Sequence, residues 1–156
     1  MDNLQQLKNN QRRIGLTGGI ASGKTTITNY IRKHKNIPIL DADHFSRELI
    51  KPNTHGYKKI LDYFGDKIID KKSNSEKEIN RKLLRNIIFK HSASKEWIEK
   101  LLHPLIKKRM IEECSQYRNN QTIVLVIPLL FEAKFEDICT EIWLSLIHIS
   151  EPTRRM

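Results

Sequence analysis

A glycine-rich segment near the start of the chain has the residue types and the spacing of a phosphate-binding loop. Residues 18–25 read GGIASGKT, which satisfies the pattern G-x-x-x-x-G-K-S/T. Glycines let successive backbone N–H groups turn inward around phosphate oxygens, and the N-terminus of a following helix adds its dipole. In this pattern Lys24 reaches the β- and γ-phosphates of a nucleoside triphosphate, and the Thr25 hydroxyl coordinates Mg²⁺. The residues expected to hold the nucleotide are Gly18, Gly19, Ala21, Ser22, Gly23, Lys24, Thr25 and Thr26.

Two carboxylates follow at a spacing suited to phosphate transfer. Asp41 and Asp43 stand two residues apart in the segment DAD, directly after a short apolar segment. One carboxylate can position a substrate hydroxyl or take its proton, and the other can lie near the metal; phosphoryl transfer needs both roles. Asp is also a good N-cap for the helical pattern that follows. We expect one of the two to cap that helix, and we favour Asp43 for the substrate role.

Three further polar side chains are each open to two interpretations. Arg47, one turn into the predicted helix after the DAD segment, could bind a substrate phosphate or pair with an acidic surface neighbour. Arg81, at the start of a later predicted helix, presents the same choice. His103 could contact a ligand or be a hydrogen-bonded core histidine, and its position alone favours the core.

The end of the third predicted strand lacks a carboxylate. The apolar run QTIVLVIPLLFE, residues 121–132, is typical of a strand buried on both faces of a parallel sheet. Val126 and Ile127 stand where a metal-binding Asp would be sought. ATPase motors and GTPase switches normally use such a carboxylate, so both classes are disfavoured. A small-molecule kinase is compatible, because Mg²⁺ can be held by the loop hydroxyl, the nucleotide phosphates and water.

The elements that must position these residues alternate between strands and helices. Strands are predicted at 12–17, at 37–40, within 121–132 and at 140–146. Helices are predicted from residue 24, at 45–50, at 55–64, after a capping box of Ser75 and Glu78, and at 94–117. Pro104 should start a new helix within the last of these ranges or kink that helix. This order predicts an α/β fold with right-handed crossovers and a helical excursion between the second and third strands. Ligands bind at the carboxyl ends of the strands in such sheets. The glycine-rich loop, the DAD segment and residues 128–132 are therefore expected to converge there.

Composition limits the class of protein further. A chain of 156 residues with 38% hydrophobic residues is long enough for one domain. The net charge of +10 suits phosphorylated small molecules or nucleic acid, but the cations are dispersed and aromatic residues make up only 7%, so no stacking platform for nucleic acid is evident. Much of the excess charge fits solvated lysine-rich faces.

Cys114 and Cys139 lack zinc-ligand spacing and suit a reducing compartment. No apolar run approaches the roughly 20 residues of a membrane span, so we expect a cytoplasmic protein that binds no membrane.

The order of several segments resembles one family. GLTGGIASGKTT, DADHFSREL, GYKKILDYFG, INRKLLRNIIF, LLHPLIKKRM and IPLLFE together resemble dephospho-coenzyme A kinase from about Arg13 to Trp143. The resemblance implies a P-loop kinase with a three-layer α/β/α core at about 12–52 and 120–145, and a helical acceptor-binding region at about 53–118. It implies transfer of the ATP γ-phosphate to the 3′-hydroxyl of dephospho-coenzyme A, the last step of coenzyme A synthesis. Lys24, Asp41 and Asp43 then become catalytic candidates, and Arg47, Arg81 and His103 become acceptor contacts.

The C-terminal segment departs from that resemblance. The family pattern would continue after the fourth strand into an arginine-bearing lid helix and a further strand, whereas residues 145–156 read SLIHISEPTRRM. We interpret this segment as translated adapter sequence joined to an interrupted gene. The alternative is a natural short variant in which Arg154 and Arg155 replace the lid. Lid arginines can contribute on the order of 10³-fold or more in rate. We therefore expect this chain to bind nucleotide but to have little kinase activity and poor stability.

Two other functions stay open at this level. Another small P-loop kinase, acting on a nucleoside, a nucleotide or shikimate, would use the same loop. A basic nucleic-acid-binding protein that uses ATP as a conformational ligand would show binding with a steep dependence on salt.

Overall fold

A computed structural model of the chain describes residues 3–19, 23–72 and 77–146. It divides into two compact units, which are described separately. The sheet unit comprises Leu7–Asp41 and Tyr117–Met156, and the helical unit comprises Met1–Gln6 and Ala42–Gln116. The acceptor-binding region expected at 53–118 overlaps most of the helical unit. The segment 147–156, which contains most of the expected non-family tail, lies outside the described residues.

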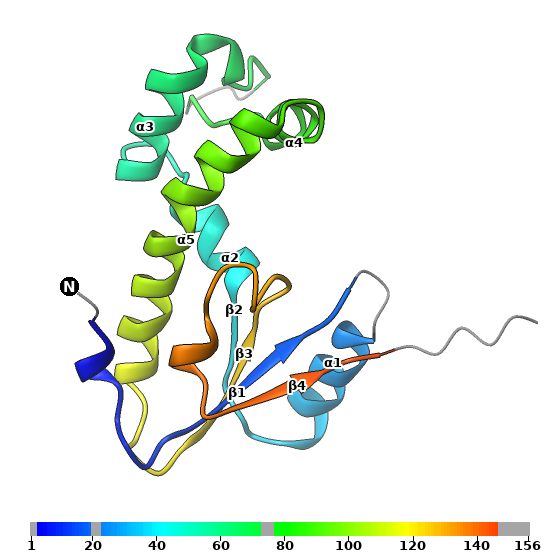
Figure 1. Cartoon of the computed structure of the whole chain (residues 1–156), viewed down its shortest axis with the longest axis vertical. Helices are drawn as coiled ribbons and strands as arrows, with labels where there is room; N and C mark the ends of the chain where they lie inside the picture. Colours follow the sequence, from blue (N-terminus) through cyan, green and yellow to red (C-terminus); the bar gives the residue numbers. More distant parts are fainter. Residues whose placement is uncertain (1–2, 20–22, 73–76, 147–156) are drawn as a thin grey trace, which may run out of the picture. The chain divides into compact units, whose positions relative to one another are not determined.

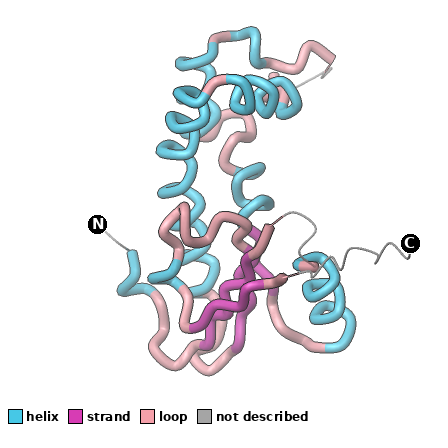
Figure 2. Tube along the Cα trace, turned by 45° about the vertical axis from the view of Figure 1, so that its right-hand side comes forward, coloured by secondary structure: helices cyan, strands magenta, loops and turns pink. Residues whose placement is uncertain are grey.

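The sheet unit is built on four parallel strands (Figures 1 and 2). The strands are β1 (Arg12–Thr17), β2 (Ile39–Asp41), β3 (Thr122–Val126) and β4 (Glu141–Leu144), in the spatial order β2-β3-β1-β4. β1 and β3 are central and almost entirely buried, as the continuous apolar runs predict. The predicted parallel sheet is therefore confirmed, with the helical part of the chain inserted between β2 and β3.

Helix α1 (Lys24–His34) packs on one face of this sheet through an apolar cluster. Ile27 and Ile31, one turn apart on the helix, contact the cluster that contains Ile14 and Leu16 of β1. Gly15 lies between Ile14 and Leu16 in β1. A Cβ added to Gly15 would lie 2.6 Å from the Cys139 Sγ. The segment after β3 therefore approaches the backbone of β1 so closely that only glycine fits there.

The helical unit contains α2 (Ala42–Glu48), α3 (His55–Phe64), α4 (Arg81–Lys90) and α5 (Ser92–Ser115). It also contains short 3-10 turns at Asn3–Gln6 and Asp66–Ile68. Its core joins α3, α4 and α5, and the buried members are Tyr57, Ile60, Phe64, Ile68, Ile79, Leu84 and Ile98. The Thr54 side chain accepts a hydrogen bond from the Tyr57 N–H and caps α3, which ends before Gly65 as predicted.

The predicted capping box before α4 is wrong. Ser75 lies outside the described residues, and the helix starts later, where the Asn80 side chain accepts a hydrogen bond from the Leu83 N–H at 3.0 Å. Ile79 forms an antiparallel bridge with Ile69, and the Asn80 N–H donates to the Ile68 carbonyl oxygen at 2.7 Å. This pairing keeps the chain extended through Ile79, so a helix cannot begin at Ser75.

A new helix at Pro104 is also wrong. Pro104 lies inside α5, which continues as one helix of 24 residues. Proline removes one N–H donor and leaves the carbonyl of the residue four positions earlier without its helical partner. Here that residue is Lys100, which is exposed, so water can satisfy the carbonyl. The helix therefore tolerates the proline.

Candidate active site

The phosphate-binding loop connects β1 to the first residue of α1. Gly23 caps the helix with φ of 85°, and Gly18 has φ of 150°, both in a region that side chains rarely adopt. The Lys24 ammonium donates hydrogen bonds to the carbonyl oxygens of Gly18 and Gly19, the second at 3.0 Å. Ala21 and Ser22 lie outside the described residues. A glycine-rich turn thus ends at a helix N-terminus with its lysine beside the loop, a suitable arrangement for triphosphate.

The two threonines of the loop lie on the first turn of α1. Thr25 and Thr26 are both exposed, and the Thr25 hydroxyl has no hydrogen-bond partner among the residues that the structure describes. Within those residues there is also no group of three His, Cys, Asp or Glu side chains that could hold a metal ion.

Three chain segments of the sheet unit meet at the carboxyl edge of the sheet, which confirms the predicted convergence for Asp41 but does not test it for Asp43. Asp41, the last residue of β2, pairs in register with Val126 at the end of β3. The Thr17 hydroxyl at the end of β1 donates to the Pro128 carbonyl oxygen at 3.0 Å. The loop after β1, the Asp41 carboxylate and the segment after β3 therefore share one edge.

Asp43 belongs to the helical unit. It is the second residue of α2, two positions after the end of β2, and its side chain is exposed. A carboxylate in the first turn of a helix is favoured by the helix dipole. N-capping of α2 by one of the two aspartates stays a prediction.

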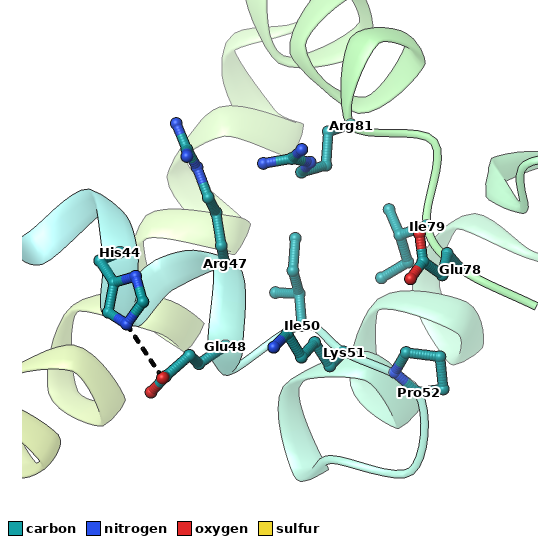
Figure 3. A pocket seen from close by; sticks show the side chains of 9 residues that line it. All are labelled: His44, Arg47, Glu48, Ile50, Lys51, Pro52, Glu78, Ile79 and Arg81. Atoms are coloured by element: carbon teal, nitrogen blue, oxygen red, sulfur yellow. Dashed lines mark ion pairs between the residues drawn. The ribbon is translucent and has the colours of Figure 1, made fainter. Parts of the chain in front are cut away.

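Arg47 and Arg81 line one pocket of the helical unit (Figure 3). The cavity has a volume of about 250 Å³. Arg47 comes from α2 and Arg81 is the first residue of α4, so the fold brings together two arginines that lie far apart in the sequence. The remaining lining residues are His44, Glu48, Ile50, Lys51, Pro52, Glu78 and Ile79.

His103 does not line this pocket. It lies on α5 and is partly buried. Burial lowers the pKa of the His103 imidazole, and the Glu99 carboxylate one turn earlier raises it by a smaller amount. The structure thus joins two of the three predicted acceptor contacts in one cavity and leaves the third outside it.

Arg109 of α5 holds α2 in place, and sequence reasoning missed this residue. Its guanidinium lies 4.0 Å from the Glu48 carboxylate and 5.4 Å from the centre of the Phe45 ring, both on α2. It also pairs with Glu113 one turn along α5 at 2.9 Å. In the sequence Arg109 follows two lysines, and nothing distinguishes it from a solvated cation. Sequence reasoning also missed Lys51, which lines the pocket. Its position four residues after Arg47 was a weak signal that the two side chains share a site.

The parallel α/β fold and the glycine loop at its carboxyl edge place the chain in the class of P-loop proteins. The family model for dephospho-CoA kinase matches residues 12–156. The chain belongs to the dephospho-CoA kinase family. The matched range includes residues 145–156, which we expected to be unlike the family.

Individual relatives agree with this assignment. A dephospho-CoA kinase of Prochlorococcus marinus strain MIT 9312 is 87% identical over 92% of this chain and 70% of its own length. A second, from strain CCMP1986 of the same species, is 63% identical over 89% of this chain and 68% of its own length. The solved dephospho-CoA kinase of Campylobacter jejuni is 25% identical, with a TM-score of 0.63 over 85% of this chain and 65% of that one. The chain thus spans about two thirds of the length of these proteins.

Within the described residues, no helix is long and apolar enough to cross a membrane.

Proposed function

We propose that the chain carries the catalytic and binding residues for transfer of the ATP γ-phosphate to the ribose 3′-hydroxyl of dephospho-coenzyme A. The products are coenzyme A and ADP, and the reaction completes coenzyme A synthesis, which we place in the cytoplasm. The observation that carries the proposal is the loop between β1 and α1, where Lys24 lies beside the carbonyls of Gly18 and Gly19 at the carboxyl edge of the sheet.

Each candidate residue has a role in this reaction. The backbone of the loop and Lys24 hold the β- and γ-phosphates, and Lys24 offsets the charge that develops on the transferred group. The acceptor oxygen forms a bond to the γ-phosphorus while the bond from that phosphorus to the oxygen of ADP breaks. The hydroxyl proton passes to the Asp43 carboxylate, which also orients the hydroxyl.

Mg²⁺ suits the donor set at the loop. The Thr25 hydroxyl would hold it together with the nucleotide phosphates, with Asp41 nearby. When bound, the ion supplies charge neutralisation on the phosphate oxygens. Arg47, Arg81 and His103 are proposed acceptor contacts in the helical unit, and the shared pocket supports the first two.

The test is a coupled assay of ADP release with a panel of acceptors. Because the chain spans 70% of its 87% identical relative, the assay uses the chain as given and the same chain extended with the remaining residues of that relative. In the extended chain we expect ADP release that depends on dephospho-coenzyme A and is absent with a nucleoside, a nucleotide or shikimate. Turnover only with another acceptor would reject the proposed acceptor.

A further inference from the structure

Thr17 ends β1 directly before the phosphate-binding loop, and hydrogen bonds hold it from two sides of the sheet unit. The residue is buried, with 3% of its surface exposed. The Thr17 hydroxyl donates a hydrogen bond to the Pro128 carbonyl oxygen at 3.0 Å, and the Ser145 N–H donates to the Thr17 carbonyl oxygen at 2.9 Å. The last residue before the loop is therefore held both by the segment after β3 and by the segment after β4.

The side-chain bond extends the contact between β1 and the chain that leaves β3. The two strands pair in parallel, and beyond β3 the Ile127 N–H donates to the Leu16 carbonyl oxygen at 3.0 Å. One residue further along both segments, the hydroxyl of Thr17 reaches the carbonyl of Pro128. A side-chain hydroxyl thus connects the two segments at the point where the glycine loop begins.

The segment that accepts this bond is fixed in the core of the sheet unit. Leu130 is fully buried, and Phe135 has only 2% of its surface exposed. The Phe135 N–H donates to the Leu130 carbonyl oxygen at 2.9 Å, which closes residues 130–135 into a turn. Two buried side chains in a closely packed core hold this turn in one position. The Pro128 carbonyl, two residues before Leu130, is therefore a fixed point for the end of β1.

The loop begins at the residue that this bond holds. Gly18 follows Thr17 with φ of 150°, and the Lys24 ammonium donates to the carbonyl oxygens of Gly18 and Gly19. A change in the direction of the chain at Thr17 would move the Gly18 carbonyl and the residues after it. Phosphate binding depends on the geometry of these backbone groups, and a site that is already in its binding geometry loses less entropy when the ligand binds.

We propose that Thr17 is a positioning residue for the phosphate-binding loop. Its hydroxyl connects the start of the loop to the fixed turn after β3, and this connection raises the affinity of the loop for a nucleoside triphosphate. The inference rests on the proposed function only in that the loop binds ATP, and it does not depend on the identity of the acceptor. Thr17 acts through the loop and not on the reacting atoms.

The other end of β1 carries a similar threonine contact, which provides a matched control. The Thr140 hydroxyl, directly before β4, donates to the Arg13 carbonyl oxygen at 3.0 Å and accepts from the Arg13 N–H at 2.8 Å. Arg13 lies four residues before Thr17, about 13 Å away along the strand. Loss of the Thr140 hydroxyl should therefore weaken the same sheet without disturbing the loop.

The experiment measures ATP binding by calorimetry for the wild type and for Thr17→Val, Thr17→Ser and Thr140→Val, at a temperature where denaturation curves show each protein to be folded. Valine keeps the branched shape and removes the hydroxyl, whereas serine keeps the hydroxyl. We expect Thr17→Val to weaken ATP binding about threefold to tenfold, as for loss of one hydrogen bond. Thr17→Ser and Thr140→Val should stay within about twofold. Both valine variants should unfold at a lower denaturant concentration than the wild type.

Steady-state kinetics give a second readout, in the chain extended with the remaining residues of its 87% identical relative. Thr17→Val should raise the KM for ATP severalfold and leave kcat and the KM for dephospho-coenzyme A within about twofold. A purely structural role would instead reduce the amount of active enzyme, and so the apparent kcat, at an unchanged KM.

The outcomes separate this inference from the proposed reaction. Equal ATP affinity in Thr17→Val and Thr140→Val overturns the positioning role, even if dephospho-coenzyme A is turned over. An equal loss of affinity in Thr17→Ser and Thr17→Val overturns it too, because the hydroxyl would then not matter. A wild type that binds ATP but does not phosphorylate dephospho-coenzyme A rejects the proposed acceptor and leaves the comparison of ATP affinities decisive. A wild type that binds no ATP would overturn both.

Discussion

The two units of the molecule build their sites in different ways. In the sheet unit, the loop between β1 and α1 uses backbone geometry, with Gly18 and Gly23 at positive φ and one lysine at the start of a helix. In the helical unit, the pocket uses side chains from α2, from the turn after it and from the start of α4. A site built from consecutive backbone groups leaves a pattern in the sequence. A site built from side chains of separate segments leaves no such continuous pattern in the sequence.

The largest expected effect comes from a substitution at Asp43 of α2. Asp43→Asn removes the proposed proton acceptor but keeps the size of the side chain. We expect kcat in the coupled assay to fall on the order of 10²- to 10⁴-fold, while calorimetry shows ATP and dephospho-coenzyme A binding nearly unchanged. Asp62→Asn, which changes an exposed carboxylate of α3, is the control. Full activity of Asp43→Asn would remove Asp43 from the mechanism.

The two tryptophans allow the stability of each unit to be followed separately. Trp97 lies on α5 in the helical unit, and Trp143 lies on β4 in the sheet unit. Replacing one by Phe leaves the fluorescence of the other as a probe of its own unit during denaturation. This design makes the comparison of the units measurable.

A substitution at Gly15 should destabilise the sheet unit. In Gly15→Ala the added Cβ would lie 2.6 Å from the Cys139 Sγ and 2.7 Å from the Leu130 Cδ1, and Leu130 is fully buried. Overpacking of this kind costs about 1–3 kcal/mol in the free energy of unfolding. The Trp143 signal of a Trp97→Phe background should report it. Gly19→Ala is the matched control, because a Cβ there meets no atom within 4 Å. The close approach is refuted if both variants unfold at the same denaturant concentration.

A substitution at Arg109 should act on the helical unit instead. Arg109→Ala removes the contacts with Glu48 and the Phe45 ring that hold α2 against α5. We expect a loss of about 1 kcal/mol, since a partly exposed cation–π contact and an ion pair are each worth less than that. The Trp97 signal in a Trp143→Phe background measures it, and exposed Lys108→Ala is the control. Equal unfolding curves for the two variants would show that Arg109 does not hold α2.

The smallest expected effect is a pH dependence from His103. Burial lowers the pKa of His103 in the folded chain below its ordinary value of 6.5. The unfolded chain therefore binds this proton first, and the folded state loses stability as the pH falls through 6.5 towards the lowered pKa. His103→Gln should flatten the fall in unfolding free energy between pH 7 and pH 5 by a fraction of a kcal/mol. An unchanged pH profile would indicate that His103 titrates alike in both states.

The same contrast explains what the sequence could predict. The apolar run of β3 and the loop pattern before α1 each depend on neighbouring residues, so β1, α1, β3 and the glycine loop follow from the sequence. The start of α4 depends on pairing between Ile69 and Ile79, and α5 continues through Pro104 where the residue four positions earlier, Lys100, is exposed. Local patterns do not contain such contacts, which explains why the capping box and the new helix were wrong. The pocket and the contacts of Arg109 also depend on packing between distant segments, so local patterns do not predict them either.

The central claim is that the sheet unit binds the phosphate donor and the helical unit binds the acceptor. The most direct test measures two affinities, for ATP and for dephospho-coenzyme A, on two variants, Lys24→Ala and Arg81→Ala. We predict that Lys24→Ala weakens ATP about tenfold or more and leaves dephospho-coenzyme A within about twofold, and that Arg81→Ala does the reverse. Loss of both ligands in one variant with the fold intact, or loss of ATP in Arg81→Ala, would contradict the account.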